Sequence, residues 1–99
     1  MAIAEISIVP LGTKTPSVSR FVARAIRVLE GEKDIKYEIT AMGTIVEGDL
    51  DRILALVEKM HEEVFKEGIV RVLTTVKIDD RRDKAQSIRD KVDSVRKKL

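Results

Sequence analysis

The chain contains no cysteine and few aromatic residues, and both shortages exclude classes of function. Without cysteine, the 99 residues form no disulfide, thiolate metal site or cysteine nucleophile. The three aromatic residues, Phe21, Tyr37 and Phe65, offer no platform on which nucleic-acid bases could stack. We therefore expect an aliphatic core and a function that uses neither thiol chemistry nor base stacking.

Long apolar runs and a strong charge imbalance are also missing. No stretch approaches the roughly 20 apolar residues of a membrane span, and the N-terminus lacks the regions of a signal peptide. The 19 basic and 17 acidic residues give a net charge of +2, with the signs interspersed over most of the chain. That is not the electrostatic pattern of a nucleic-acid-binding protein. We expect a cytoplasmic protein that binds neither nucleic acid nor membrane.

The composition that remains is that of one folded domain. Of the residues, 43% are apolar and 36% are charged, which supports a core beneath a heavily charged surface. Compact domains commonly have about 100 residues. The sequence therefore predicts a single domain covering residues 1–99.

Apolar periodicity predicts four strands and three helices. Residues 2–9 alternate with a period of two until Pro10 and Gly12, and helical spacing of apolar residues follows Thr15, an expected N-cap. Asp49 is the expected N-cap of a second helix. In chain order, we expect a strand at 2–9, a helix from 16 to about 29, a strand at 35–40, a tight connection at 41–43, a strand from there through 47, a helix from 50 to near 68, a strand at 69–78 and a helix from about 82.

This order predicts an α+β, ferredoxin-like βαββαβ sandwich with an additional C-terminal helix. Its strands should lie in the order 4-1-3-2, with two helices on one sheet face. Apolar residues such as Ile3 and Val9 also occur on the other face, so we expect oligomerisation to bury it. The last helix carries a narrow apolar seam, which fits a helix on its own subunit and a subunit contact equally well: Ala85, Ile88, Val92, Val95 and Leu99.

Two carboxylates, Glu5 and Glu47, are expected on one face of the two central strands. Their expected neighbours on that face are Ile3, Ser7, Val9, Thr44 and Ile45. Two acids on a covered face repel each other unless a cation or hydrogen-bond donor lies between them. Arg71 and Lys77 of the last strand could supply the charge in an ion-pair network at a subunit interface. Alternatively, the acids accept hydrogen bonds from an amino heterocycle or a cation in a pocket.

The segment from Gly12 to Ser19 is polar and leads into a helix. Ser17 and Ser19 are either ordinary capping residues or part of an anion site at a helix N-terminus. The spacing of a phosphate-binding P-loop is absent.

No catalytic or metal-binding pattern is evident. His61, the only histidine, has Phe65 four residues later, where a zinc-protease helix would have a second histidine. The acidic and basic residues at 79–83 favour capping and ion pairing at a strand-to-helix turn. No nucleophile, base and oxyanion hole come together, so we expect no enzyme, no metal site and no cofactor.

Four segments resemble the thiamine-binding (YkoF-like) protein family, a conserved family formerly uncharacterised. They are Ala4-Glu-Ile-Ser-Ile-Val-Pro-Leu-Gly-Thr13, Ser17-Val-Ser19, Met42-Gly-Thr-Ile-Val-Glu-Gly48 and Arg71-Val-Leu-Thr-Thr-Val-Lys-Ile-Asp-Asp-Arg-Arg-Asp83. The resemblance extends over nearly the whole chain, and its combined motifs are specific.

The resemblance implies a homotetramer, built as a dimer of dimers, that binds thiamine or its hydroxymethylpyrimidine part in thiamine supply or salvage. Residues that would line or support the pocket are Glu5, Ser7, Ser17, Ser19, Met42, Thr44 and Glu47. Arg71, Thr75 and Lys77 serve either this pocket or the subunit contact. A structural or regulatory homo-oligomer without a small-molecule ligand is the second hypothesis, and an enzyme of thiamine metabolism is the third.

Overall fold

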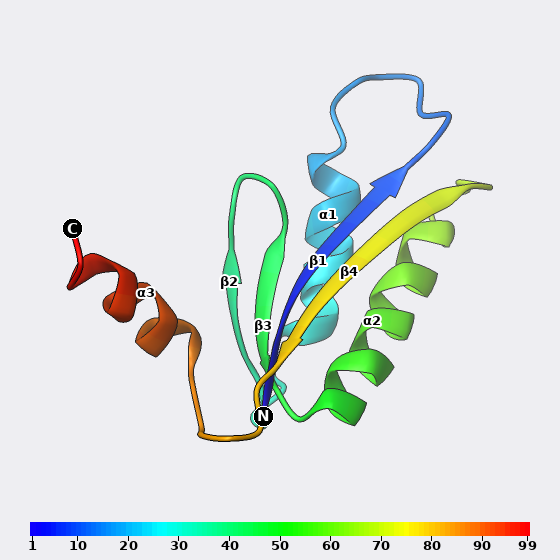
Figure 1. The fold of residues 1–99 in the computed structure, drawn as a ribbon. Coiled ribbons are helices and arrows are strands. Elements are labelled where there is room, and N and C mark those ends of the chain that lie inside the picture. Colours follow the sequence, from blue (N-terminus) through cyan, green and yellow to red (C-terminus); the bar gives the residue numbers. More distant parts are fainter.

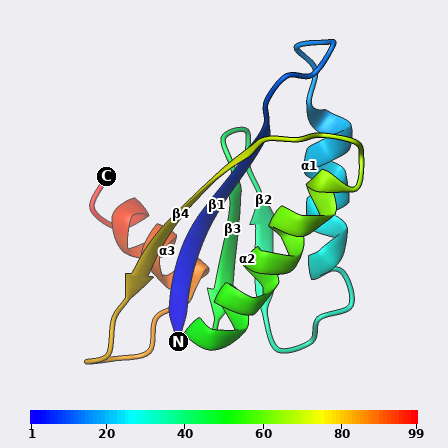
Figure 2. The same cartoon turned by 90° about the vertical axis from the view of Figure 1, so that its right-hand side faces the viewer.

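A computed structural model describes all 99 residues and has one four-stranded antiparallel sheet. Helices α1 and α2 lie on one face of the sheet, and α3 lies on the opposite side (Figures 1 and 2). The elements in chain order are β1 (Ala2–Pro10), α1 (Ser19–Ile26), a 3-10 turn (Arg27–Leu29), β2 (Lys36–Ile39), β3 (Thr44–Gly48), α2 (Leu50–Phe65), β4 (Val72–Asp80) and α3 (Ile88–Arg96). The α+β class and the βαββαβ order with an added C-terminal helix are as predicted.

The strands lie in the order β2-β3-β1-β4, the same order as the predicted 4-1-3-2 read from the other edge. β1 and β3 are therefore central. In β1, Ala4, Ile6 and Ile8 face the helices and are buried, whereas Glu5 and Ser7 on the other face are half-buried. The period-two alternation predicted these two faces correctly.

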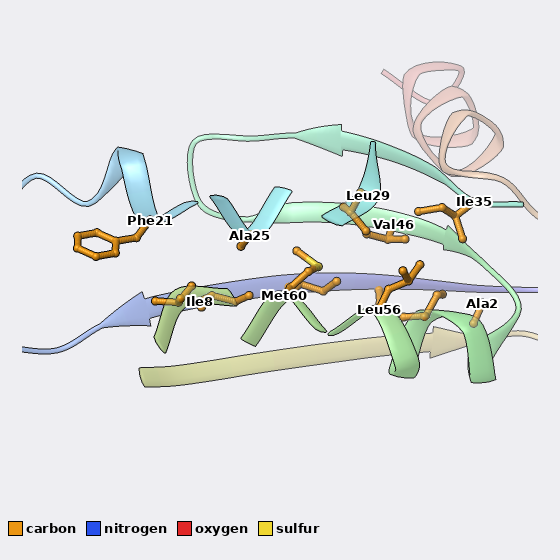
Figure 3. Close-up of a cluster of buried hydrophobic side chains, with 13 residues drawn as sticks. Ala2, Ile8, Phe21, Ala25, Leu29, Ile35, Val46, Leu56 and Met60 are labelled. Carbon is orange, nitrogen blue, oxygen red and sulfur yellow. The ribbon is translucent and has the colours of Figure 1, made fainter. Parts of the chain in front are cut away.

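The core between the sheet and the two helices is aliphatic, as the shortage of aromatic residues predicts. Phe21 is its one aromatic member, and α2 contributes four side chains that are almost completely buried, at helical spacing. Figure 3 shows α1, α2 and the sheet meeting in this cluster. The α2 side chains are Ile53, Leu56, Met60 and Val64.

Helix α1 begins later than predicted. Thr15 is not its N-cap: its hydroxyl oxygen accepts a hydrogen bond from the Ser17 N–H (3.3 Å), and the helix starts at Ser19. Val18 occupies the N-cap position and makes no side-chain cap. The hydroxyl of Thr15 therefore stabilises a turn within the loop, which competes with helix formation.

The bounds of the two C-terminal elements also differ from the prediction. β4 begins at Val72, so Arg71 precedes the strand, although its carbonyl still accepts a hydrogen bond from the Leu11 N–H (2.9 Å). Helix α3 begins at Ile88, six residues after the predicted start at Arg82. Ser87 caps it and forms a capping box with Asp90. Ala85 therefore lies outside the helix and is not part of its seam.

Two smaller expectations have mixed outcomes. Asp49 is the N-cap residue of α2, as predicted, but its side chain makes no capping hydrogen bond. The hairpin between β2 and β3 is present, and β3 starts at Thr44, directly after the predicted connection at residues 41–43. No helix of the chain is long and apolar enough to pass through a bilayer.

Candidate functional site

Glu5 and Glu47 do share a sheet face, the one that α1 and α2 leave uncovered, here called the open face. Glu5 lies opposite Ile45 and Glu47 lies opposite Ile3, so the two acids occupy diagonal positions. Such positions have Cα atoms about 7–8 Å apart. Thr44, by contrast, lies opposite the core residue Ile6 and faces the helices. The expectation that Thr44 shares the face of Ile45 was wrong, because neighbouring residues of a strand point to opposite faces.

Glu5 is half-exposed and weakly paired. Lys77 lies directly opposite it on β4, with 3.9 Å between Lys77 Nζ and Glu5 Oε1. The Lys77 side chain is 81% exposed. Ion pairs at such exposure contribute about 0–1 kcal/mol, so Glu5 remains available to another hydrogen-bond donor.

Glu47 is buried, with 5% of its surface exposed. The backbone N–H of Ile88, the first residue of α3, donates to Glu47 Oε1 at 3.4 Å. A carboxylate is favourable at this position because the first N–H groups of a helix lack partners within it. The chain's own α3 therefore contributes to covering Glu47, where we had expected only a second subunit to do so.

A hollow of about 310 Å³ lies between α1 and the turn of the β2–β3 hairpin. Its lining is mostly apolar and includes three of the predicted pocket residues, Ser7, Met42 and Thr44. Glu5 lies near the hairpin but on the open face: a Cβ placed on the lining residue Gly43 would lie 3.4 Å from Glu5 Cγ. Other lining residues come from α1 and from the hairpin: Val18, Val22, Ala25, Ile26, Ile39, Thr40 and Ala41.

The contribution of α1 and Thr40 to this hollow was not predicted from the sequence. The apolar residues of α1 were assigned entirely to the core by their spacing. The Thr40 hydroxyl fixes the hairpin turn, since it donates to the Gly43 carbonyl (2.7 Å) and accepts from the N–H of Gly43 (3.1 Å) and Met42 (3.3 Å). A threonine three residues before a glycine in a short connection is the signal that could have identified it.

Ser17 and Ser19 lie elsewhere, in a second hollow of about 640 Å³ that is mostly polar. Both serines are exposed, and Lys14 and Arg20 also line this hollow. The seven predicted pocket residues are therefore divided among three places: the hairpin hollow with Glu5 beside it, the loop hollow, and the α3 end of the open face.

The residues assigned to either pocket or interface have different positions. Thr75 lies opposite Ser7 on the open face and is exposed. Lys77 pairs with Glu5, as described above. Arg71 is exposed and precedes β4, so it does not form part of the strand's ladder on that face.

The remaining titratable candidates have structural partners. His61 is half-buried, and its Nδ1 lies 2.6 Å from the Thr74 hydroxyl, so it is not a free surface residue. Arg82 donates to Asp80 and holds the pKa of that carboxyl below its ordinary value, and Arg81 does the same for Asp83. These pairs confirm the predicted ion pairing at 79–83. No three His, Asp or Glu side chains gather where a metal ion could be held.

Comparison with known proteins gives a consistent result. The sequence model of the family described as "Thiamine-binding protein" matches residues 4–96. The chain is 47% identical to the UPF0045 protein YqgV of Bacillus subtilis, an alignment that covers 100% of this chain and 98% of that protein. It is 46% identical to a UPF0045 protein of Methanothermobacter thermautotrophicus, over the full length of both.

Solved structures of similar proteins have the same fold. A hypothetical protein from Methanocaldococcus jannaschii superposes with a TM-score of 0.87 at 44% identity, covering 95% of this chain and 94% of that one. A Thermotoga maritima protein, described in connection with thiamine biosynthesis or salvage, superposes with a TM-score of 0.78 at 22% identity, covering 95% and 97%. The match of the family model to nearly the whole chain, together with these full-length relatives, establishes that the chain belongs to the thiamine-binding protein family.

Proposed function

We propose that the protein binds thiamine or its hydroxymethylpyrimidine part and does not transform it chemically. The observation that carries this proposal is the match of the thiamine-binding family model to residues 4–96. The description of the Thermotoga maritima neighbour, which connects that protein with thiamine biosynthesis or salvage, supports the same ligand class. The proposed role is supply or salvage of the vitamin.

The hairpin hollow is the position we propose for the ligand. Its volume of about 310 Å³ lies at the lower end of the range of roughly 300–1,000 Å³ for small-molecule pockets. Apolar walls suit the faces of a flat ring, and Met42 at the rim is flexible enough to close over it. Thr44, whose side chain faces the helices as the hollow does, supplies a polar group that can orient a ligand, whereas the Ser7 side chain points to the open face. The size of the hollow favours the pyrimidine ring over the whole vitamin.

Carboxylates explain why an aminopyrimidine would be preferred to an apolar ring. Glu5 lies beside Gly43 with its side chain on the open face, where it can accept a hydrogen bond from the exocyclic amine or from a protonated ring nitrogen of a ligand that extends past the hairpin to that face. A second carboxylate suits the cationic thiazolium ring of intact thiamine. Because no aromatic side chain lines the hollow, cation–π attraction is missing, and we expect modest affinity for thiamine.

The arrangement of the reactive side chains supports binding without catalysis. The hydroxyls of Ser17 and Ser19 are in a different hollow from Ser7, and the one histidine is engaged with Thr74. The histidine therefore stands beside no hydroxyl of the proposed site, where it could act as a base.

We further propose a single ferredoxin-like domain that assembles in the cytoplasm as a tetramer, a dimer of dimers. Exposed apolar residues on the open face, Val9 (37%) and Leu73 (57%), support burial by a second subunit. The second candidate function is a structural or regulatory oligomer without a ligand. The contacts of Glu5 with Lys77 and of Glu47 with Ile88 favour it, because they engage both carboxylates within the chain.

Thermal unfolding with a panel of ligands separates these two functions. The panel contains thiamine, its phosphates and hydroxymethylpyrimidine, with pyridoxine as an unrelated heterocycle. A ligand present at 100 times its dissociation constant stabilises the folded state by about 2.7 kcal/mol. We expect at least one thiamine-related compound, and not pyridoxine, to raise the unfolding temperature. An unchanged unfolding temperature with every compound up to millimolar concentration would favour the ligand-free oligomer.

A further inference from the structure

Glu47 is a buried acid with few partners. Its surface is 95% buried, yet the one hydrogen bond that its carboxylate receives, from the Ile88 N–H, is 3.4 Å long. Backbone N–H groups usually donate at about 2.9–3.0 Å, so this bond is weak. A carboxylate can accept about four hydrogen bonds, and because no side-chain oxygen or nitrogen of the chain is both buried and without a partner, the other oxygen of Glu47 keeps some contact with solvent. Glu47 therefore has unused capacity for a stronger donor.

Helix α3, which supplies this weak bond, is loosely held. No other helix or strand packs extensively against it, and residues 81–87, which connect it to β4, form neither helix nor strand. Figures 1 and 2 show α3 standing away from the body of the protein on the open-face side. Its apolar residues after Ile88 remain exposed, Val92 (43%) and Val95 (60%), and so does Leu99 (95%) beyond the end of the helix.

Two contacts near its amino end position α3. The Ser87–Asp90 capping box stabilises the first turn, and Lys91 Nζ lies 2.7 Å from Asp79 Oδ2 on β4. The lysine pair is largely solvent-exposed and therefore weak. Ile88, with 8% exposure, is the one buried side chain of the helix. The position of α3 against the open face thus depends on a single buried residue and on a capped first turn.

We propose that the amino end of α3 is a displaceable cover over Glu47, and that a cationic hydrogen-bond donor takes the place of the Ile88 N–H there. The chemical class is an ammonium, an amidinium or a protonated amino heterocycle, each of which donates a charge-assisted hydrogen bond to the carboxylate. The choice of thiamine as the first probe rests on the proposed function, whereas the displacement of α3 does not. A thiamine molecule that displaces α3 binds through its aminopyrimidine at the α3 end of the open face and not in the hairpin hollow.

Competition between α3 and the cation has a measurable consequence. If Glu47 is available in only a fraction of the molecules, the apparent dissociation constant is the intrinsic one divided by that fraction. Loosening α3 must then tighten binding, although the substituted residue does not touch the ligand. A purely structural helix predicts no such effect.

Ser87→Ala tests the cover without changing the charge of the protein. Loss of an N-cap destabilises a helix start by an amount that corresponds to about fivefold in population. We expect Ser87→Ala to bind thiamine about two- to fivefold more tightly in calorimetry, with faster hydrogen exchange in the first turn of α3. Ser94→Ala, an exposed change within the same helix, should alter neither quantity. Equal affinities of Ser87→Ala and Ser94→Ala would overturn the proposal.

Hydrogen exchange of the unmodified protein gives a second readout. Saturating thiamine should accelerate exchange of the α3 amides, whereas a ligand bound elsewhere leaves them unchanged or slows them. Unchanged or slower exchange contradicts the cover and leaves the proposed function intact. If thiamine binds to none of the proteins, the proposed function fails, and benzamidinium decides the cover with the same exchange measurement. Faster exchange of the α3 amides with benzamidinium supports the proposed cover. Unchanged exchange at every concentration overturns it.

Discussion

Glu47 of β3 and Ile88 of α3, 41 residues apart in the sequence, are joined by a hydrogen bond from a backbone N–H to a buried carboxylate. This contact gives Glu47 a structural role that its position in a strand does not reveal. It also means that any ligand that uses Glu47 must compete with the chain itself. Glu5, half-exposed beside the hairpin hollow, is the more accessible of the two acids.

Glu47→Gln should weaken thiamine binding about five- to tenfold. The substitution keeps the shape but replaces a charged acceptor by a neutral one, and hydrogen bonds to charged groups are worth about 1.5–3 kcal/mol against about 1 kcal/mol for neutral ones. Glu38→Gln, an exposed change on β2 opposite Ile45, is the matched control. Equal calorimetric affinities of the two variants would mean that Glu47 does not contact the ligand and only holds α3 in place.

Gly43→Ala should reduce both stability and ligand affinity. A Cβ at this position would lie 3.0 Å from the Ile6 carbonyl oxygen and 3.4 Å from Glu5 Cγ, so the strand or the Glu5 side chain must shift. Overpacking of this kind typically costs about 1–3 kcal/mol. Urea unfolding measures the stability, and titration of the folded variant measures the affinity. An unchanged affinity would show that the ligand binds neither at the hairpin turn nor at the Glu5 side chain next to it.

The first turn of α3 should lose stability in acid. Asp90 accepts a hydrogen bond from the Ser87 N–H, which holds its pKa below the ordinary value of 3.8. Because the folded-state pKa is the lower one, this stabilisation is complete above pH 3.8 and is lost as pH falls through the folded-state pKa. Amide signals of α3 followed by NMR should report its loss below pH 3.8. Asp90→Asn, which does not titrate, should show a smaller pH dependence over that range; an identical dependence contradicts the assignment.

Leu56→Ala should destabilise the protein by about 2–5 kcal/mol, because Leu56 is 1% exposed and its removal leaves a cavity beneath the sheet. Leu54→Ala is the matched control on the same helix, since Leu54 is 47% exposed. We expect the control to cost less than about 1 kcal/mol. Urea unfolding of both variants checks the difference, and similar losses would show that the core has been misplaced.

The sequence was sufficient for the strand order and for the two faces of β1, and insufficient for the starts of β4, α1 and α3. Alternation in β1 identifies its buried and open faces because side chains of a strand point to alternate sides. The start of α1 was misjudged because Thr15 followed by Pro16 also suits a turn. Here the Thr15 hydroxyl oxygen accepts a hydrogen bond from the Ser17 N–H in the loop before the helix. The start of α3 was misjudged because Ala85 continues the apolar spacing by coincidence. The capping pair Ser87 and Asp90 was the better signal.

The candidate site was predictable only in part, for a geometric reason. Placing Glu5 and Glu47 on one face requires only strand order and alternation, and both were available from the sequence. The separation of Ser17 and Ser19 from Ser7 depends on the path of the loop after β1, which no periodicity encodes. The cover that Ile88 forms over Glu47 depends on where the connection at 81–87 leads the chain, and that too lay beyond pattern reasoning.

Isothermal titration calorimetry of the unmodified protein with thiamine and with hydroxymethylpyrimidine tests the central claim most directly. We predict saturable binding of at least one of them, with one ligand per chain and no change in the ligand recovered afterwards. The absence of binding heat for both at several temperatures would contradict a thiamine-binding function. Recovery of a chemically altered ligand would contradict the absence of catalysis.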